Sequence, residues 1–298
     1  MVSKPDLSRQ KAPVEQVILR SDQVFLCLLI NRRHNHIRVI DFRTGNFPVK
    51  RVFIQSLAQR ERAHKVFTLV ERDEVPGWLR LGFQKEGTVP GYYKRSDAFV
   101  LGRVLHDPQP PTSYEVDAKA LASAAKKYAK EVSNIDAPAK MRTIDQREAL
   151  EKVRHVNNGR RPLTSFDPFG RHSLRLYLAV SPDRHSEENV VAAEFQDCFG
   201  NARLELLFSP NNGTEASAAI TGLRTMMNEL QDRGIVTAFA TSRTDNELLT
   251  ALYQAAGFRK TGKMAGQFFD GEKYIDEILW TRKLAVAAAD QVAMDGPP

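Results

Sequence analysis

The apolar positions in the second half of the chain predict strands that alternate with helices. The predicted strands are short apolar runs at residues 174–180, 190–195, 204–208 and 235–241, followed by two more around Asp270-Gly271. One predicted helix has apolar residues every three or four positions, a cap at Thr214 and an end at Gly234. A second helix is expected at 245–256. This alternation predicts an α/β sheet.

The first half shows a related pattern. Residues 14–42 alternate between apolar and polar side chains around a polar turn at 31–35, which indicates a pair of strands. A buried strand is expected at 65–70, and a short helix that follows it is expected to end at Gly82. A longer helix between the strand pair and the strand at 65–70 is indicated by the apolar spacing of Val49, Val52, Phe53 and Leu57.

The sequence pattern predicts a linker between the two halves. Proline-rich residues 106–111 interrupt the pattern, and residues 114–133 then predict an Ala- and Lys-rich helix with a solvated basic face. Residues 143–146 match a capping box that begins a further helix. Both ends of the chain lack a pattern and are expected to be frayed.

Two segments of the sequence repeat each other. Residues 81–93 and 256–268 align without a gap at an offset of 175 positions, and three glycines, a phenylalanine and a closing aromatic residue coincide. A strand and a short helix precede each segment, and a strand follows each. The chain is therefore predicted to contain two copies of one fold.

Composition narrows the class of protein. The 298 residues are 42% hydrophobic and carry a formal charge of +7, which is ordinary for a globular protein and favours a phosphate-bearing partner. The N-terminus has no apolar segment of a signal peptide, no run is long enough to span a bilayer, and the two cysteines form no metal-binding pattern. We expect a cytoplasmic protein without a membrane or metal partner.

Residues 246–258 carry the most specific motif. Asn246 opens the predicted helix, Tyr253 follows two turns later on the same face, and Gly257-Phe258 ends it. This resembles the N-x6-Y-x3-GF segment of the GNAT acetyltransferase superfamily. The resemblance implies that Tyr253 is the general acid that protonates a departing thiolate and that the Asn246 amide binds the pantetheine arm of acetyl-CoA. The alternative is that Tyr253 is a core residue and Asn246 only a helix cap.

A second GNAT hallmark is the turn that holds the CoA pyrophosphate on backbone N–H groups and a helix N-terminus. The corresponding place is the turn at 209–217. Its expected cofactor-binding residues are Asn212, Gly213, Thr214, Ala216 and Ser217. The turn departs from the family pattern because it lacks the basic residue and because Glu215 brings a negative charge.

Acyl transfer to an amine also needs a base, since only the unprotonated amine attacks. In GNAT enzymes this base is often on the strand before the turn, where the sequence has Glu205; the alternative is an exposed strand residue. Backbone N–H groups between Leu206 and Phe208 are expected to bind the thioester and its developing oxyanion.

The first copy lacks these groups. Counting back from Gly82-Phe83, Trp78 stands where Tyr253 stands and Glu71 where Asn246 stands. Trp has no acidic hydroxyl, and no pyrophosphate turn is recognisable. The first half is therefore expected to be degenerate.

Segments 37–42, 86–93, 96–98 and 257–284 are also similar to the β-lysine N-acetyltransferase family. These resemblances imply an α/β fold of tandem GNAT-like domains, each a mixed, mostly antiparallel sheet flanked by helices. The expected division is a tail at 1–13, a degenerate domain at 14–106, a linker with the basic helix at 107–141, the acyltransferase domain at 142–284 and a tail at 285–298. The implied reaction is direct transfer from an acyl-CoA, expected to be acetyl-CoA, to a small amine such as a lysine-like compound or β-lysine.

Other functions stay open from the sequence. A catalytically inactive scaffold that binds a protein or nucleic acid would explain Glu215, and a longer acyl-CoA or an aminoacyl-tRNA could be the donor. His34 and His36 flank a turn that is interpreted as solvated, and Cys198 as an inert thiol. Arg32-Arg33 and Arg160-Arg161 lack interleaved aromatic residues, so nucleic acid is not expected as a partner. The oligomeric state is not indicated.

Overall fold

The computed structural model describes residues 11–105, 139–154, 162–196 and 198–284, together with Ser123, Lys126, Lys127 and Lys130. The predicted linker at 106–111, the side chains of most of the basic helix and the C-terminal tail lie outside the described residues.

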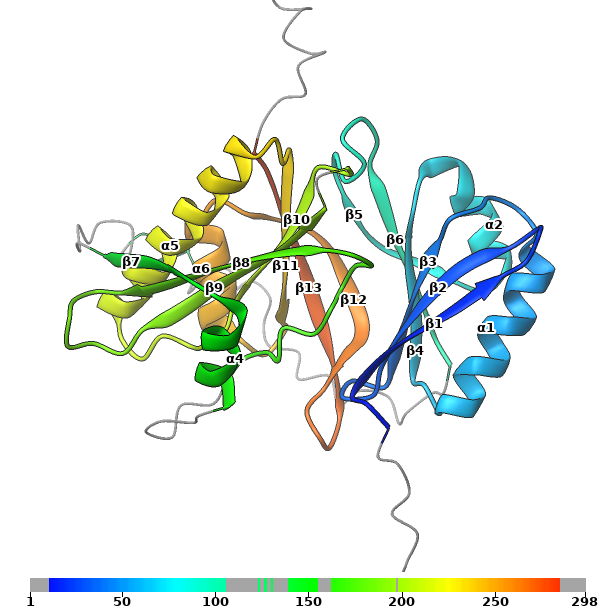
Figure 1. Cartoon of the computed structure of the whole chain (residues 1–298), viewed down its shortest axis with the longest axis horizontal. Coiled ribbons are helices and arrows are strands. Elements are labelled where there is room, and N and C mark those ends of the chain that lie inside the picture. The colour runs from blue at the N-terminus through cyan, green and yellow to red at the C-terminus, as the bar shows by residue number, and fades with distance from the viewer. Residues whose placement is uncertain are drawn as a thin grey trace, which may run out of the picture.

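The described strands form one thirteen-stranded sheet in the order β1-β2-β3-β4-β6-β5-β12-β13-β11-β10-β9-β8-β7 (Figure 1). The first half contributes β1 (Val14–Arg20), β2 (Phe25–Asn31), β3 (His36–Asp41), β4 (Lys65–Val70), β5 (Gln84–Val89) and β6 (Ala98–Val104). The second half contributes β7 (Lys140–Ile144), β8 (Leu174–Ser181), β9 (Asn189–Gln196), β10 (Asn201–Leu206), β11 (Thr237–Arg243), β12 (Arg259–Phe269) and β13 (Tyr274–Lys283).

The two halves of the sheet have the same internal order. In the first half β2, β3, β4, β6 and β5 lie side by side, and in the second half β9, β10, β11, β13 and β12 do so. Among the strands that the structure describes, only β3 with β4 and β10 with β11 pair in parallel. Each parallel pair is connected by a helix, as a parallel crossover requires. The predicted α/β class with a mostly antiparallel sheet is confirmed, whereas the domain boundaries stay a prediction.

Helices cover one face of each half. In the first half these are α1 (Phe47–Glu61) and α2 (Val75–Arg80), the latter preceded by the 3-10 turn η1 (Arg72–Glu74). In the second half they are α5 (Gly213–Asp232) and α6 (Glu247–Ala255), with α4 (Gln146–Arg154) on the opposite face, against Tyr177 and Phe208. Apolar clusters fill the space between each half and its helices. A further cluster, which includes Phe67 and Phe239, joins the two halves.

The repeated segments meet at the centre of the sheet. Gly87 of β5 pairs with Gly262 of β12, and these are equivalent positions in the sequence repeat. Each strand also has a register shift immediately before its glycine, after Lys85 and after Lys260. The strand order and this pairing therefore relate the two halves of the sheet by an approximate two-fold axis at the junction.

The two short helices that precede these segments end alike. Gly82 and Gly257 both have positive φ, at 86° and 89°. The N–H of Phe83 donates to the Trp78 carbonyl, and the N–H of Phe258 donates to the Tyr253 carbonyl. This is the geometry of a glycine-terminated helix, and it repeats at the predicted offset.

Several local predictions were wrong. Residues 14–42 contain three strands rather than two. Asn212, not Thr214, caps α5 by accepting from the Glu215 N–H, and Asp145 accepts from the Glu148 N–H at the start of α4. Val49 and Val52 are exposed, because α1 turns Ile54, Leu57 and Ala58 toward the sheet.

Candidate active site

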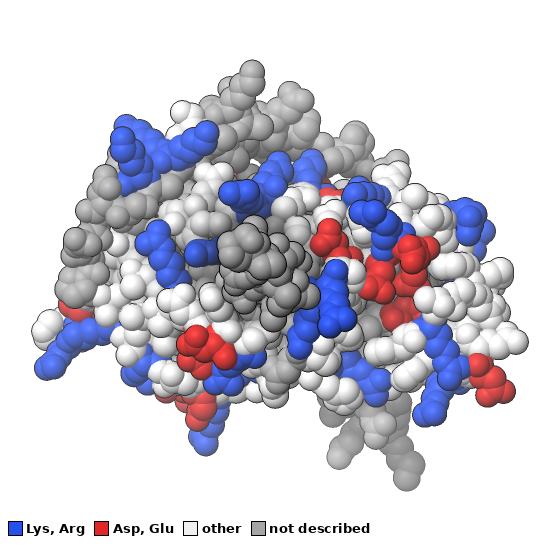
Figure 2. Space-filling view, turned by 90° about the horizontal axis from the view of Figure 1, so that it is seen from above, with Lys and Arg blue, Asp and Glu red and all other residues white. Residues whose placement is uncertain are grey.

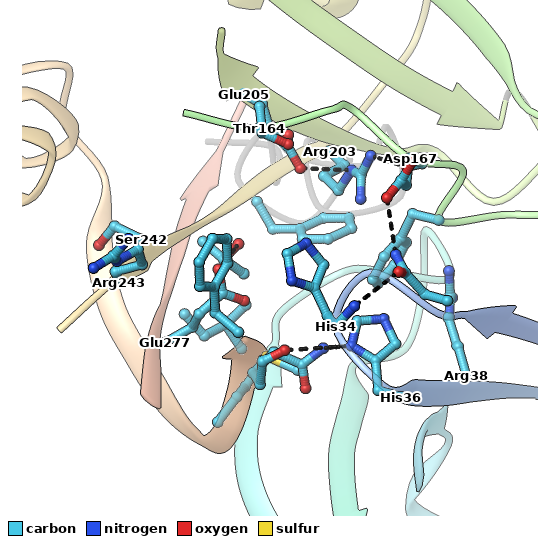
Figure 3. A pocket seen from close by; sticks show the side chains of 18 of the residues that line it. His34, His36, Arg38, Thr164, Asp167, Arg203, Glu205, Ser242, Arg243 and Glu277 are labelled. Carbon is cyan, nitrogen blue, oxygen red and sulfur yellow. Dashed lines mark hydrogen bonds and ion pairs between the residues drawn. The ribbon is translucent and has the colours of Figure 1, made fainter. Parts of the chain in front are cut away.

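A cavity of about 130 Å³ lies between the two halves of the sheet. Its lining includes His34, His36 and Arg38 from the first half and Arg203, Glu205 and Glu277 from the second (Figure 3). Phe169 and Asp167, from the segment before β8, also contribute to the wall. Charged groups of both signs thus face a small space that neither half encloses alone.

The cavity reaches a gap between two parallel strands. Strands β10 and β11 are paired at only three positions, from Asn201↔Thr237 to Arg203↔Phe239, although both strands continue beyond them. Beyond Arg203 the backbone N–H and C=O groups of β10 and β11 do not bond to each other. The gap can therefore accept an extended ligand that forms hydrogen bonds with a strand edge.

Tyr253 projects from α6 to this gap. Its ring packs against Phe258 and Trp280, and the side chain is 1% exposed, yet it borders the cavity. The backbone N–H of Leu206 faces its phenol oxygen. Burial raises the pKa of Tyr253 far above its ordinary value, the Glu205 carboxylate adds to the increase, and the Leu206 N–H lowers this pKa by favouring the ionised form. The hydroxyl therefore stays protonated and able to donate a hydrogen bond.

Glu205 lies on β10 at the cavity wall, as predicted. Its Oε1 is 3.3 Å from Arg203 Nε, while its Oε2 is buried without a hydrogen-bond partner. Arg203 also contacts Glu194 of β9 at 3.4 Å. Glu205 is thus part of a charged group rather than an exposed strand residue.

Glu277 is a cavity residue that the sequence prediction missed. It lies on β13, and Thr241 donates to its Oε1 at 3.3 Å. Burial raises the pKa of Glu277 to about 7, with a further contribution from the like charge of Glu205. A carboxyl group that titrates near neutral pH is suited to act as a general base. The sequence shows two adjacent acidic residues on this strand, Asp276 and Glu277, and alternation alone does not show which of them faces a cavity.

The Glu215 carboxylate binds the backbone of the turn before α5. The Asn212 side chain accepts from the Glu215 N–H at 2.9 Å, and Glu215 Oε2 accepts from the Asn211 N–H at 3.0 Å. Gly213 and Thr214 form the first turn of the helix, and Ala216 and Ser217 are buried behind it. The oriented N–H groups predicted for the pyrophosphate are present, but Glu215 competes for them.

The backbone amides after Glu205 point in different directions. The Leu206 N–H meets Tyr253 at the gap, whereas the Leu207 N–H donates to Val190 and the Phe208 N–H to the Asn189 side chain. The Leu206 N–H faces the gap and the Tyr253 hydroxyl, whereas the Phe208 N–H is used on the β9 side. The thioester-binding role expected for these amides stays a prediction.

Asn246 lies at the cavity and caps α6. Its side-chain oxygen accepts from the Leu249 N–H at 2.9 Å, which is the helix-cap alternative. The NH₂ of the same amide is a separate donor, so capping does not prevent binding of a ligand carbonyl.

The interpretation of residues 31–35 as a solvated turn was wrong. The turn packs against β12: His34 Nδ1 lies 3.3 Å from the Phe269 carbonyl and His36 Nδ1 lies 3.3 Å from that of Gln267. Burial lowers the pKa of His36 to about 3, so its ring is neutral. Among the described residues no group of three or more His, Cys, Asp or Glu could hold a metal ion.

The charged side chains that can be seen on one face of the molecule do not gather into a single basic patch. On the face seen in Figure 2, Lys and Arg side chains are scattered over both halves and are separated by uncharged surface and by a group of Asp and Glu. Within the described part of the chain, no helix has the length and apolar character needed to cross a membrane.

Comparison with known proteins shows similarity over about half of the chain. The ribosomal-protein-S18-alanine N-acetyltransferase from Escherichia coli is 16% identical, with 51% of this chain and 97% of that chain covered and a TM-score of 0.38. A spermidine N-acetyltransferase variant from Vibrio cholerae is 15% identical over 51% and 99% of the two chains, with a TM-score of 0.41. The same enzyme in complex with CoA and spermine is 13% identical over 50% and 97%, with a TM-score of 0.36. No family model and no curated protein matches the chain.

Proposed function

We propose that this chain is an acyl-CoA-dependent N-acyltransferase that transfers an acetyl group directly to a small amine. The observation that carries the proposal is the arrangement at the gap between β10 and β11. There the Tyr253 phenol meets the Leu206 N–H on one side, and a carboxyl with a pKa near 7 lines the cavity on the other. The resemblance of residues 246–258 to the GNAT motif supports the same reaction.

Each group has a distinct task in this proposal. Glu277 accepts a proton from the incoming ammonium, and the free amine then attacks the thioester carbonyl carbon. The carbon–sulfur bond breaks as the amide forms. Tyr253 donates a hydrogen bond to the sulfur, which leaves as a thiolate and takes up the second proton that the nitrogen loses as the amide forms. The pKa of a phenol is already above that of a thiol, and burial raises the pKa of Tyr253 further, so stabilisation of the thiolate fits Tyr253 better than complete proton transfer.

Glu277 replaces Glu205 as our assigned base. Glu205 contacts Arg203, and its negative charge helps to raise the pKa of Glu277. The amine therefore meets a carboxyl group poised near neutral pH beside a second carboxylate that attracts its positive charge.

The turn before α5, with its helix N-terminus, is proposed to hold the pyrophosphate once Glu215 moves aside. The pantetheine arm would lie in the gap, near Asn246 and the Leu206 amide. Thiol release from acetyl-CoA, measured against a panel of small amines, tests this function. Release that is absent with every amine, or as fast in Tyr253→Phe as in the wild type, would contradict it.

One observation favours a second candidate. Because Glu215 accepts from the Asn211 N–H, the turn is satisfied without a phosphate, as expected for an inactive scaffold that binds another macromolecule. Calorimetric titration with acetyl-CoA separates the two functions, since a scaffold would show no binding at millimolar ligand.

A further inference from the structure

Arg38 is a buried cation in the cavity wall that has no ion-pair partner among the described residues. It lies on β3 and is 6% exposed. Its Nη2 donates to the Tyr92 hydroxyl at 3.1 Å, while Nε and Nη1 are buried without a hydrogen-bond partner. The guanidinium stacks on Phe169, with its central carbon 3.5 Å from the ring centroid. The side chain is thus fixed in place with unused donors at the cavity.

The approximate two-fold axis relates Arg38 to Arg203. Arg38 pairs with Phe67 across the parallel strands of the first half, and Arg203 pairs with Phe239 across those of the second. Both guanidinium groups also contact Phe169, from which Arg203 is 5.2 Å away. The two arginines are therefore equivalent positions that face the same cavity.

Only Arg203 is neutralised. Its partners are Glu194, directly across on β9, and Glu205, two residues further along β10. The equivalent positions around Arg38 are Leu29, directly across on β2, and Ile40, two residues further along β3. In the part of the chain that the structure describes, no ion pair is formed by Arg38.

An uncompensated buried cation needs an external partner. Arginine does not lose its proton in proteins, and burying its charge without a counter-charge is strongly unfavourable. A ligand anion that enters the cavity would supply both the opposite charge and the missing acceptors. Charge-assisted bonds of this kind also fix the orientation of the ligand.

We propose that Arg38 binds a carboxylate carried by the acceptor amine, so that the site selects amines that also have a carboxylate group. Figure 3 shows Arg38 and Glu277 on opposite sides of the cavity. The ammonium end of such a compound then lies at Glu277 and Glu205, and its carboxylate lies at Arg38. One unpaired cation matches one carboxylate, whereas a doubly charged phosphate would bring excess negative charge toward Asp167 and Glu205. This inference rests on the proposed function for the identity of the ligand as an acceptor.

Matched amines with and without a carboxylate test the inference by calorimetric titration in the absence of acetyl-CoA. The pairs are L-lysine with cadaverine, L-ornithine with putrescine, and 4-aminobutyrate with propylamine. In at least one pair, the wild type is expected to bind the carboxylate member about 10- to 100-fold more tightly, the range for a charge-assisted hydrogen bond. Arg38→Met should abolish that preference, and Arg38→Lys should keep part of it. Arg60→Met, an exposed position on α1, is the control that should keep all of it.

A second measurement detects the buried charge itself. Without ligand, Arg38→Met should unfold at a higher temperature than the wild type, because the apolar side chain removes an unpaired buried cation. The inference is overturned if no pair shows an Arg38-dependent preference for the amine with a carboxylate. It is also overturned if Arg38→Met unfolds at a lower temperature than the wild type and keeps the same preference.

The same amines in a thiol-release assay separate this inference from the proposed function. Thiol release without a carboxylate preference would leave the acyltransferase in place and overturn the role of Arg38. Arg38-dependent binding without thiol release would contradict the acyltransferase and leave the carboxylate site standing.

Discussion

Gly87 and Gly262 face each other as strand partners at the junction of the two halves. A Cβ on Gly262 would lie 2.4 Å from the Glu86 carbonyl oxygen and 2.5 Å from the Gly87 Cα. Both contacts are with backbone, which cannot rotate aside as a side chain can. The close approach of the two copies therefore depends on the absence of a side chain at this position.

We expect Gly262→Ala to lower the free energy of unfolding by about 3 kcal/mol, as over-packing against backbone does. Gly271→Ala is the control, because Gly271 has open space around it and only the cost of its positive φ, about 1 kcal/mol, applies. Urea unfolding curves measure the difference. Equal losses in the two variants would show that the junction is not tightly packed.

Tyr253→Phe should lower kcat about 100-fold or more, because the departing thiolate loses its hydrogen-bond donor. Stability should change little, since the ring and its contacts with Phe258 and Trp280 are kept. Tyr177→Phe is the matched control: it removes another buried hydroxyl of the same half, one without a hydrogen-bond partner. Rates of thiol release that fall equally in both variants would contradict the assigned role.

Glu277→Gln should remove the pH dependence of kcat/KM. In the wild type this quantity should rise tenfold per pH unit and level off above about pH 7, where Glu277 is ionised and can accept a proton. The variant should be slow at every pH, without this inflection. An inflection near pH 7 that persists in Glu277→Gln would assign the base to another residue.

The same group links stability to pH. The pKa of Glu277 is raised from 4.5 to about 7, so the folded state holds the proton more tightly than the unfolded state. The free energy of unfolding therefore falls as the pH rises from 4.5 through 7. Glu277→Gln should be more stable than the wild type at pH 8 by about 3 kcal/mol and equal to it at pH 4. A stabilisation that is the same at both pH values would contradict the shifted pKa.

Glu215→Gln should tighten binding of acetyl-CoA several-fold, since it removes a negative charge from the turn proposed to hold the pyrophosphate. Stability should change by less than about 1 kcal/mol, because the Gln carbonyl oxygen can still accept from the Asn211 N–H. Glu229→Gln removes an exposed charge near the other end of the same helix and should leave acetyl-CoA binding unchanged. Weaker binding in Glu215→Gln would indicate that the carboxylate orders the turn for the ligand.

The sequence predicted the order of strands and helices from β8 to β13 because each of these elements has its own apolar period, whereas the strand β7 was not predicted. The sequence repeat also aligned Gly87 with Gly262, and these two residues are strand partners at the junction. The helix caps and the buried face of α1 were predicted less well. Asn212 and Thr214 can both cap a helix, and packing decides which of them does so.

The cavity could not be predicted, because its walls come from segments far apart in the sequence. The environment of Glu277 depends on Glu205 and Thr241 of neighbouring strands, and that of His36 depends on β12. A local pattern shows that such a residue is polar. It does not show that a second half of the molecule covers it.

The approximate two-fold axis through the glycine junction passes between halves that are no longer alike. Strand pairing places Ala98 where the other half has Glu277, and Leu29 where it has Glu194. Two identical chains assembled around such an axis would have to carry every substitution twice, on both sides of the shared cavity. Here both sides of the cavity belong to one polypeptide, so each side can change independently. Acid–base chemistry and anion recognition can therefore lie on opposite walls of the same cavity.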